Sequence, residues 1–503
     1  MTVRSFLLVA LVGMGAAACS TGAGVPGGDG GGDSEGSGGG WNGGGGSAGG
    51  TGWDGEQPSS DVAREQREPD PRVTCDGLDA SKPLVLYLSA DDSNSMGSPV
   101  QAREALVQWG FAPQGIRTYE FLNYYHIDYD APPLGELKLF AEGAAGENPG
   151  EIDLQLAVRS FDAVTPRRPM NLTFVLDTSG SMEGAPISRE QAAVKAIAAS
   201  LAPGDIVSMV TWNTGNNVVL DGYSVIGASD SVVTGAADKL SADGGTDLHG
   251  GLVAGYGLAT KNYDPAKLNR VILISDGGAN VGITDKDLIA LSSEDADKEG
   301  IYLVGVGVGP ADGYNDRLMD TVTDKGRGAY VYLDSKEEAS RMFIDRFDET
   351  MEVAARGVQV ELTLPWYFQM QKFYGEEYSE NPEEVEPQHL APSDAMIFNQ
   401  VLKACDPAVV VDTDPVVLRV TWKTPLTYLE KETSIETTVG DLLSGPAPHL
   451  AKGQAIIAYA EALKTGDSAA LHEALVKVDA ANGSGADPEL TEIAKLIPLH
   501  PNF

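Results

Sequence analysis

A carboxylate and two hydroxyls follow an apolar run within one short turn. The run is Asn171-Leu-Thr-Phe-Val-Leu-Asp-Thr-Ser-Gly-Ser-Met182, and its end carries Asp177, Ser179 and Ser181. These side chains offer oxygen ligands only, with neither thiolate nor imidazole among them. Because sites built from oxygen take hard cations, the turn predicts binding of Mg²⁺, Mn²⁺ or Ca²⁺ in preference to zinc or copper.

Two later stretches supply further oxygen ligands. Gly244-Gly-Thr-Asp-Leu248 is a glycine-marked loop that carries Thr246, and Arg270-Val-Ile-Leu-Ile-Ser-Asp-Gly277 is a second apolar strand that ends near Asp276. Ligands of parallel sheets gather beyond the carboxyl ends of the strands, so we expect these groups to converge. The predicted metal ligands are Asp177, Ser179, Ser181, Thr246 and Asp276.

This combination of motifs resembles a von Willebrand factor type A domain with a metal-ion-dependent adhesion site, and the resemblance covers about residues 169–350. It implies a binding module in which a carboxylate from a protein partner fills one coordination position of the ion. The physics agrees, because an ion held by only two acidic residues keeps positive charge that favours an acidic ligand.

The resemblance also implies a role for each ligand residue. Ser179 and Ser181 would coordinate the ion directly, and Thr246 would do so in the open state. Asp177 and Asp276 would hold the ion largely through waters.

A second D-x-S-x-S pattern occurs earlier in the chain, at Asp91, Ser93 and Ser95. No apolar strand ending in Ser-Asp-Gly follows it before Asp177. We interpret it as a strand-to-helix turn capped by small polar residues and not as a metal site. The glycines of Gly305-Val-Gly-Val-Gly309 lack the G-x-G-x-x-G spacing of dinucleotide folds, and they predict a tight strand-end loop beside the metal edge.

Apolar strands alternate with helical periodicity through the candidate metal domain, which predicts a doubly wound parallel sheet. The expected strands are 172–176, 206–211, 271–274, 301–306 and 330–333. The domain is inserted between β-rich flanking segments at 73–168 and 357–440, and a helical C-terminal tail follows at 449–497. The chain is therefore expected to be an α/β protein with β-rich flanks.

The flanking segments show strands of their own. Expected strands before the insertion are 84–88, 137–141 and 152–161, with a helix at 101–110; strands after it are 358–364, 395–402, 416–421 and 434–439. The aromatic run from Tyr119 to Asp130 resembles a segment of a domain often found just before bacterial type A domains.

The first residues have the layout of a secretory signal peptide over 1–18, with Arg4, an apolar run and small residues. Ala16-Ala-Ala-Cys19 resembles a lipobox, with Ala16 where leucine is usual, and an ordinary signal peptidase could also cut after Ala18. A Gly-rich tether follows over 19–72. We expect a cell-envelope lipoprotein anchored through Cys19, in the outer membrane by the resemblance; a secreted protein is the alternative. Cys19→Ala should release it from the membrane fraction, and a variant that still sediments with membrane would contradict lipidation.

The chain has three cysteines. Lipidation of Cys19 leaves an even pair, and in an oxidising compartment Cys75 and Cys405 would form a disulfide. Two unpaired thiols are the alternative, because spacing along the sequence does not place their Cα atoms. If the two cysteines pair, the strands on both sides of the metal domain would build one β-sandwich, a layout like the hybrid region of integrins.

Charge and histidine placement bear on the class of function. The formal net charge of −38 excludes a nucleic-acid or anionic-lipid surface, since such contacts need clustered Lys and Arg. None of the six histidines stands in an H-E-x-x-H or triad-like context, and only His249 lies near the predicted ligands in sequence. We therefore predict a non-enzymatic, metal-mediated adhesion protein. A metal-dependent hydrolase and a structural envelope scaffold remain the alternatives.

Overall fold

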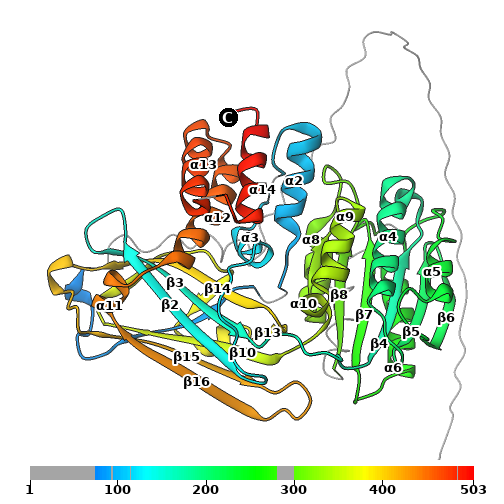
Figure 1. The fold of residues 1–503 in the computed structure, drawn as a ribbon, viewed down its shortest axis with the longest axis horizontal. Coiled ribbons are helices and arrows are strands. Elements are labelled where there is room, and N and C mark those ends of the chain that lie inside the picture. Colours follow the sequence, from blue (N-terminus) through cyan, green and yellow to red (C-terminus); the bar gives the residue numbers. More distant parts are fainter. Residues whose placement is uncertain (1–73, 92–93, 114, 280–299, 484) are drawn as a thin grey trace, which may run out of the picture. The chain divides into compact units, whose positions relative to one another are not determined.

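The computed structural model describes residues 74–503 apart from 92–93, 114, 280–299 and 484 (Figure 1). The predicted signal peptide, Cys19 and most of the region up to the first strand lie outside the described residues. Among the helices that are described, none is long and apolar enough to cross a membrane.

A six-stranded sheet, here called the central sheet, lies in the middle of the chain. Its order is β6-β5-β4-β7-β8-β9, and every neighbouring pair is parallel except β5 and β6. The strands are β4 (Met170–Asp177), β5 (Ile206–Trp212), β6 (Asn216–Ser224), β7 (Leu268–Ser275), β8 (Ile301–Gly307) and β9 (Tyr330–Tyr332). This topology confirms the predicted α/β fold with a mostly parallel sheet.

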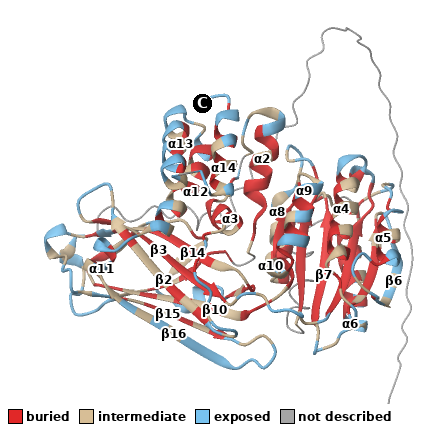
Figure 2. Cartoon of the chain, viewed as in Figure 1, coloured by how far each residue is buried: buried red, intermediate tan, exposed pale blue. Residues whose placement is uncertain are grey.

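Helices cover both faces of the central sheet, so its inner strands are buried throughout and mostly apolar. Every residue of β4 is buried: Val175 belongs to one core cluster, whereas Phe174 and Leu176 belong to another. Figure 2 shows this burial along the strands. The helices of this region are α4 (Ala185–Ala199), α5 (Ser231–Ala237), α6 (Leu248–Lys261), α8 (Asp316–Gly326), α9 (Lys336–Ser340) and α10 (Phe347–Met351).

The two flanking segments form one β-sandwich around a shared core. One sheet has the order β12-β1-β10-β15-β16 with β13 beside β10, and the other is β11-β14-β3-β2. The strands are β1 (Leu84–Ser89), β2 (Leu137–Ala145), β3 (Glu151–Ser160), β10 (Ala355–Leu364), β11 (Phe368–Phe373), β12 (Glu377–Ser379), β13 (Gln388–Leu390), β14 (Ala395–Ala404), β15 (Pro415–Lys423) and β16 (Glu430–Thr438). Because β1 pairs with β10 and β3 with β14, neither flank is a separate sheet, and the sandwich hypothesis is confirmed.

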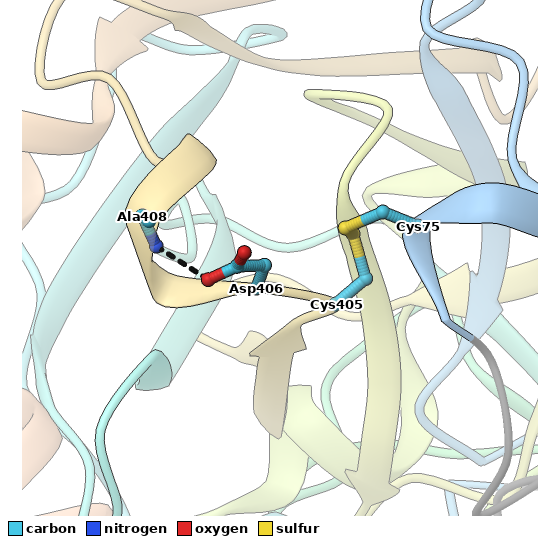
Figure 3. The surroundings of a disulfide bond; sticks show 4 residues. All are labelled: Cys75, Cys405, Asp406 and Ala408. Carbon is cyan, nitrogen blue, oxygen red and sulfur yellow. Dashed lines mark hydrogen bonds between the residues drawn. A yellow bond between two sulfur atoms is a disulfide. The ribbon is translucent and has the colours of Figure 1, made fainter.

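A disulfide joins the flanks covalently (Figure 3). Cys75 and Cys405 are bonded, with their Cα atoms 5.2 Å apart and a sequence separation of 330. Cys405 is the first residue after β14. The next residue, Asp406, accepts a hydrogen bond from the Ala408 amide. The predicted cysteine pair is therefore confirmed, and its loop encloses the whole central sheet.

The remaining helices come from both ends of the described chain. They are α2 (Gly97–Trp109), α3 (Thr118–Tyr124), α11 (Val439–Ser444), α12 (Pro448–Thr465), α13 (Ser468–Asn482) and α14 (Pro488–Leu496). Residues of α2, α3 and α12 share one hydrophobic core with α4, so these helices and the central sheet are packed together. The helical C-terminal region is confirmed.

Several strands depart from the sequence-based expectation. The strands β6, β11, β12 and β13 were not expected, and β16 begins at Glu430 where a start at 434 was expected. β6 and β16 are edge strands whose residues are mostly exposed, and β12 and β13 are only three residues long, so these four lack the buried alternation by which a strand is recognised.

Candidate metal centre

The first ligand turn begins where β4 ends. Because β4 and β7 are parallel neighbours, Asp177 and Ser275 reach the same edge of the central sheet. Asp177 is fully buried and its carboxylate is held on both sides. The Ser179 amide donates to its Oδ1 at 2.9 Å, and the Ser275 hydroxyl donates to its Oδ2 at 2.7 Å. These bonds fix the carboxylate in the turn.

The two predicted serine ligands lie together. The Oγ atoms of Ser179 and Ser181 are 3.1 Å apart, close enough for both to contact one small ion. Ser179 is fully buried and Ser181 is exposed. One serine of the pair therefore faces the protein interior and the other is accessible to solvent.

Thr246 and Asp276 join this group from two other loops. A Cβ atom added to Gly278 would lie 3.1 Å from Oδ1 of Asp276, 3.5 Å from Cγ2 of Thr246 and 3.9 Å from Oγ of Ser181. One small residue thus marks the place where three loops meet. The Gly278 amide also donates to Oδ1 of Asp276 at 3.1 Å.

Backbone hydrogen bonds tie the first ligand turn to the loop before α6. The Gly180 amide donates to the Gly244 carbonyl at 3.1 Å, and the Asp243 amide donates to the Thr178 carbonyl at 2.8 Å. Asp247 then caps α6 by accepting from the Gly250 amide. The loop that carries Thr246 is therefore tied to the serine turn on one side of Thr246 and to the start of α6 on the other.

The electrostatics of the edge favour a cation. Burial raises the pKa of Asp177 to about 7; hydrogen bonds from Ser179 and Ser275 oppose the rise, and the charge of Asp276 adds to it. A positive ion at the edge would relieve both the burial and the repulsion. The donor set is carboxylate and hydroxyl oxygen, which suits Mg²⁺, Mn²⁺ or Ca²⁺.

All five predicted ligand residues therefore lie at one edge, and their assignment as ligands stays a prediction. The donors include two carboxylates, Asp177 and Asp276, and the described residues contain no cluster of three or more His, Cys, Asp or Glu side chains that could hold a metal. His249, the one histidine near the predicted ligands in sequence, is a half-buried residue in the first turn of α6.

Two residues of the earlier D-x-S-x-S pattern, Asp91 and Ser95, form hydrogen bonds within the fold. Asp91 accepts from the Ser95 amide and from Nδ2 of Asn123, while the Ser95 hydroxyl donates to Glu120. Ser93 lies outside the described residues. The Glu120 carboxylate also accepts from the Ser98 amide, so a glutamate of α3, and not a small polar residue of the turn, holds the start of α2.

The glycines at the end of β8 allow close packing. A Cβ at Gly305 would lie 2.1 Å from Oγ1 of Thr323, and one at Gly307 would lie 2.1 Å from the Tyr314 hydroxyl. At Gly309 it would lie 3.1 Å from Cβ of Asp276, so this loop abuts the metal edge as expected.

Sequence reasoning missed two residues of this edge. Ser275 was visible as part of Ser-Asp-Gly, but its bond to Asp177 depends on the pairing of β4 with β7. Glu190 was missed altogether. It is fully buried on α4, and the signal was a glutamate in line with the buried Pro186, Ala193 and Val194.

Residues 172–279 match the family model of the von Willebrand factor type A domain. The chain thus carries a von Willebrand factor type A domain, as the motifs indicated. Such domains are mostly non-enzymatic interaction modules, and the domain indicates a protein-interaction or adhesion-type role.

Among curated proteins, the chain is 28% identical over 303 residues to the uncharacterized protein YfbK of Escherichia coli (strain K12), which covers 57% of this chain and 51% of that protein. It is 25% identical over 221 residues to the uncharacterized protein sll0103 of Synechocystis sp., covering 44% and 51%. The chain spans about half the length of these two relatives. Inter-alpha-trypsin inhibitor heavy chain H1 of Sus scrofa is 27% identical over 199 residues, covering 38% and 22%.

Two solved structures are similar in fold alone. A von Willebrand factor type A protein from Catenulispora acidiphila has a TM-score of 0.46 at 15% identity, covering 71% of this chain and 89% of that one. The ArnB paralog VWA2 from Sulfolobus acidocaldarius has a TM-score of 0.40 at 14% identity, covering 73% and 96%.

Proposed function

We propose that the type A domain binds one divalent cation, Mg²⁺, Mn²⁺ or Ca²⁺, and through it holds an acidic side chain of a protein partner in the cell envelope. The observation that carries the proposal is the convergence of five oxygen-bearing side chains from three loops at one edge of the central sheet. When bound, the cation would supply a positive charge to which a partner carboxylate can bind.

The exposure of the site supports an open coordination position. Asp177, Ser179 and Thr246 are buried, whereas Ser181 is exposed and Asp276 is half-buried. Groups on the buried side would hold the ion, and the exposed side leaves room for a ligand from another protein. An ion held in this way can bind a partner carboxylate without any covalent bond being broken, which is the action of a binding module.

Capture of a partner should depend on the cation and on Thr246. We expect the purified protein, immobilised in Mg²⁺, to retain a partner from an envelope extract and to release it in EDTA. Thr246→Ala should lose most of the captured partner, because it removes one predicted ligand hydroxyl. Mass spectrometry of the bound fraction provides the measurement.

Thr260→Ala is the matched control, because this exposed threonine lies near the far end of α6, the helix that follows Thr246. It should retain the partner as well as the wild type does. Capture that persists in EDTA and in Thr246→Ala would contradict a cation-mediated interaction.

A further inference from the structure

Glu190 is a buried acid without a counter-ion. Its side chain is 0% exposed on α4, and neither carboxylate oxygen has a hydrogen-bond partner within normal limits. The adjacent Arg189 does not serve it: that guanidinium pairs with Glu104 of α2 and donates to the carbonyls of Val308 and Gly309. An ionised carboxylate in this state is strongly disfavoured unless a positive charge compensates it.

The charged side chains that act on Glu190 are both acidic. Burial raises the pKa of Glu190 well above its usual range, and the negative charges of Asp177 and Asp276 raise it further. Only the backbone amide of Asp177 lowers this pKa. Asp177 and Asp276 are also the two acidic residues of the candidate metal centre. The packing agrees: α4, which carries Glu190, contacts both the short turn Gly180–Met182 that follows Asp177 and the strand β7 that leads to Asp276. The three acidic residues therefore lie near the ends of β4 and β7 and the start of α4.

We propose that Glu190 is a third acidic residue of the cation site, positioned behind Asp177, where its charge helps to retain the ion. The proposal rests on the proposed function, since it presumes that a cation binds at this edge. It explains why a buried, unpartnered acid is kept beside two others: a bound cation would compensate all three. Asp177 already shares its charge with the Ser179 amide and the Ser275 hydroxyl, so a further acid strengthens the hold on the ion.

The alternative is a neutral carboxylic acid that merely fills space in the helix packing. The two roles differ in what removal of the charge does. A charge that serves the ion weakens cation binding when it is lost, whereas a space-filling group does not. In both roles the loss of a buried, unpartnered acid makes the cation-free protein no less stable.

Titration of the full chain with Mn²⁺ by calorimetry tests the proposal, together with thermal unfolding in EDTA. Glu190→Gln keeps the shape and removes the charge. We expect its Mn²⁺ affinity to fall about 10-fold to 100-fold, the range found when a group behind the direct ligands is lost. Its unfolding temperature in EDTA should equal or exceed that of the wild type. Glu190→Met, an apolar residue of similar length, should behave in the same way.

Glu338→Gln is the control, because Glu338 is a buried carboxylate on α9 that pairs with Arg103 away from the metal edge. It should leave Mn²⁺ affinity unchanged. If the wild type binds no Mn²⁺, the proposed function and this inference both fail. If the wild type binds and Glu190→Gln binds equally well, this inference alone fails. Glu190 variants that are less stable than the wild type in EDTA would also overturn it.

Discussion

Asp177→Ala is expected to abolish divalent-cation binding while leaving the fold intact. The carboxylate lies beyond the end of β4 and is held by Ser179 and Ser275, so its loss removes a predicted ligand and no apolar packing. The affinity should fall about 100-fold or more, the upper end of the loss found when a group that supports a bound metal ion is removed. Asp276→Ala should have a similar effect.

Thermal unfolding with and without Mn²⁺ measures this loss. A cation at 100 times its dissociation constant stabilises a folded protein by about 2.7 kcal/mol, so the wild type should unfold at a higher temperature in Mn²⁺ than in EDTA. Asp177→Ala should show no such difference. Asp221→Ala, at an exposed acid of β6 that pairs with Lys261, is the control and should respond like the wild type. A full Mn²⁺ response in Asp177→Ala would exclude this residue from the site.

Loss of the Cys75–Cys405 disulfide should have the largest effect on stability. The bond closes a loop of 330 residues and joins the two halves of the sandwich, so its removal frees a long chain in the unfolded state. On the loop-entropy account, the free energy of unfolding should fall by about 6 kcal/mol. Unfolding in denaturant, with and without a reductant, measures the change.

The double variant Cys75→Ser with Cys405→Ser is the matched control, because it should be as unstable as the reduced wild type and should not respond to the reductant. Two thiols that can be alkylated in the folded, unreduced protein would show instead that the bond does not form.

The central sheet could be predicted because its inner strands are buried on both faces. In β4 and β7 every residue is buried, and each strand is mostly apolar and ends at a polar turn. The edge strands β6 and β16 were missed or shortened because exposed strands carry no such signal. The cysteines suggested their own pairing, but only the fold brings Cys75 and Cys405 together.

The candidate metal centre, too, could be predicted from the sequence only in part. Short motifs identify ligand types at strand ends, and the pairing of parallel strands predicts that they meet. The bond from Ser275 to Asp177 and the placement of Glu190 against the two aspartates arise between segments about 100 residues apart or across a helix, where the sequence holds no pattern to read.

Diffraction from crystals grown with Mn²⁺, recorded where manganese scatters anomalously, tests the cation site most directly. The account predicts one anomalous peak at the edge of the central sheet, roughly 2.2 Å from the hydroxyl oxygens of Ser179 and Ser181. Well-ordered crystals with no peak at these serines, or with a peak only elsewhere on the chain, would contradict it.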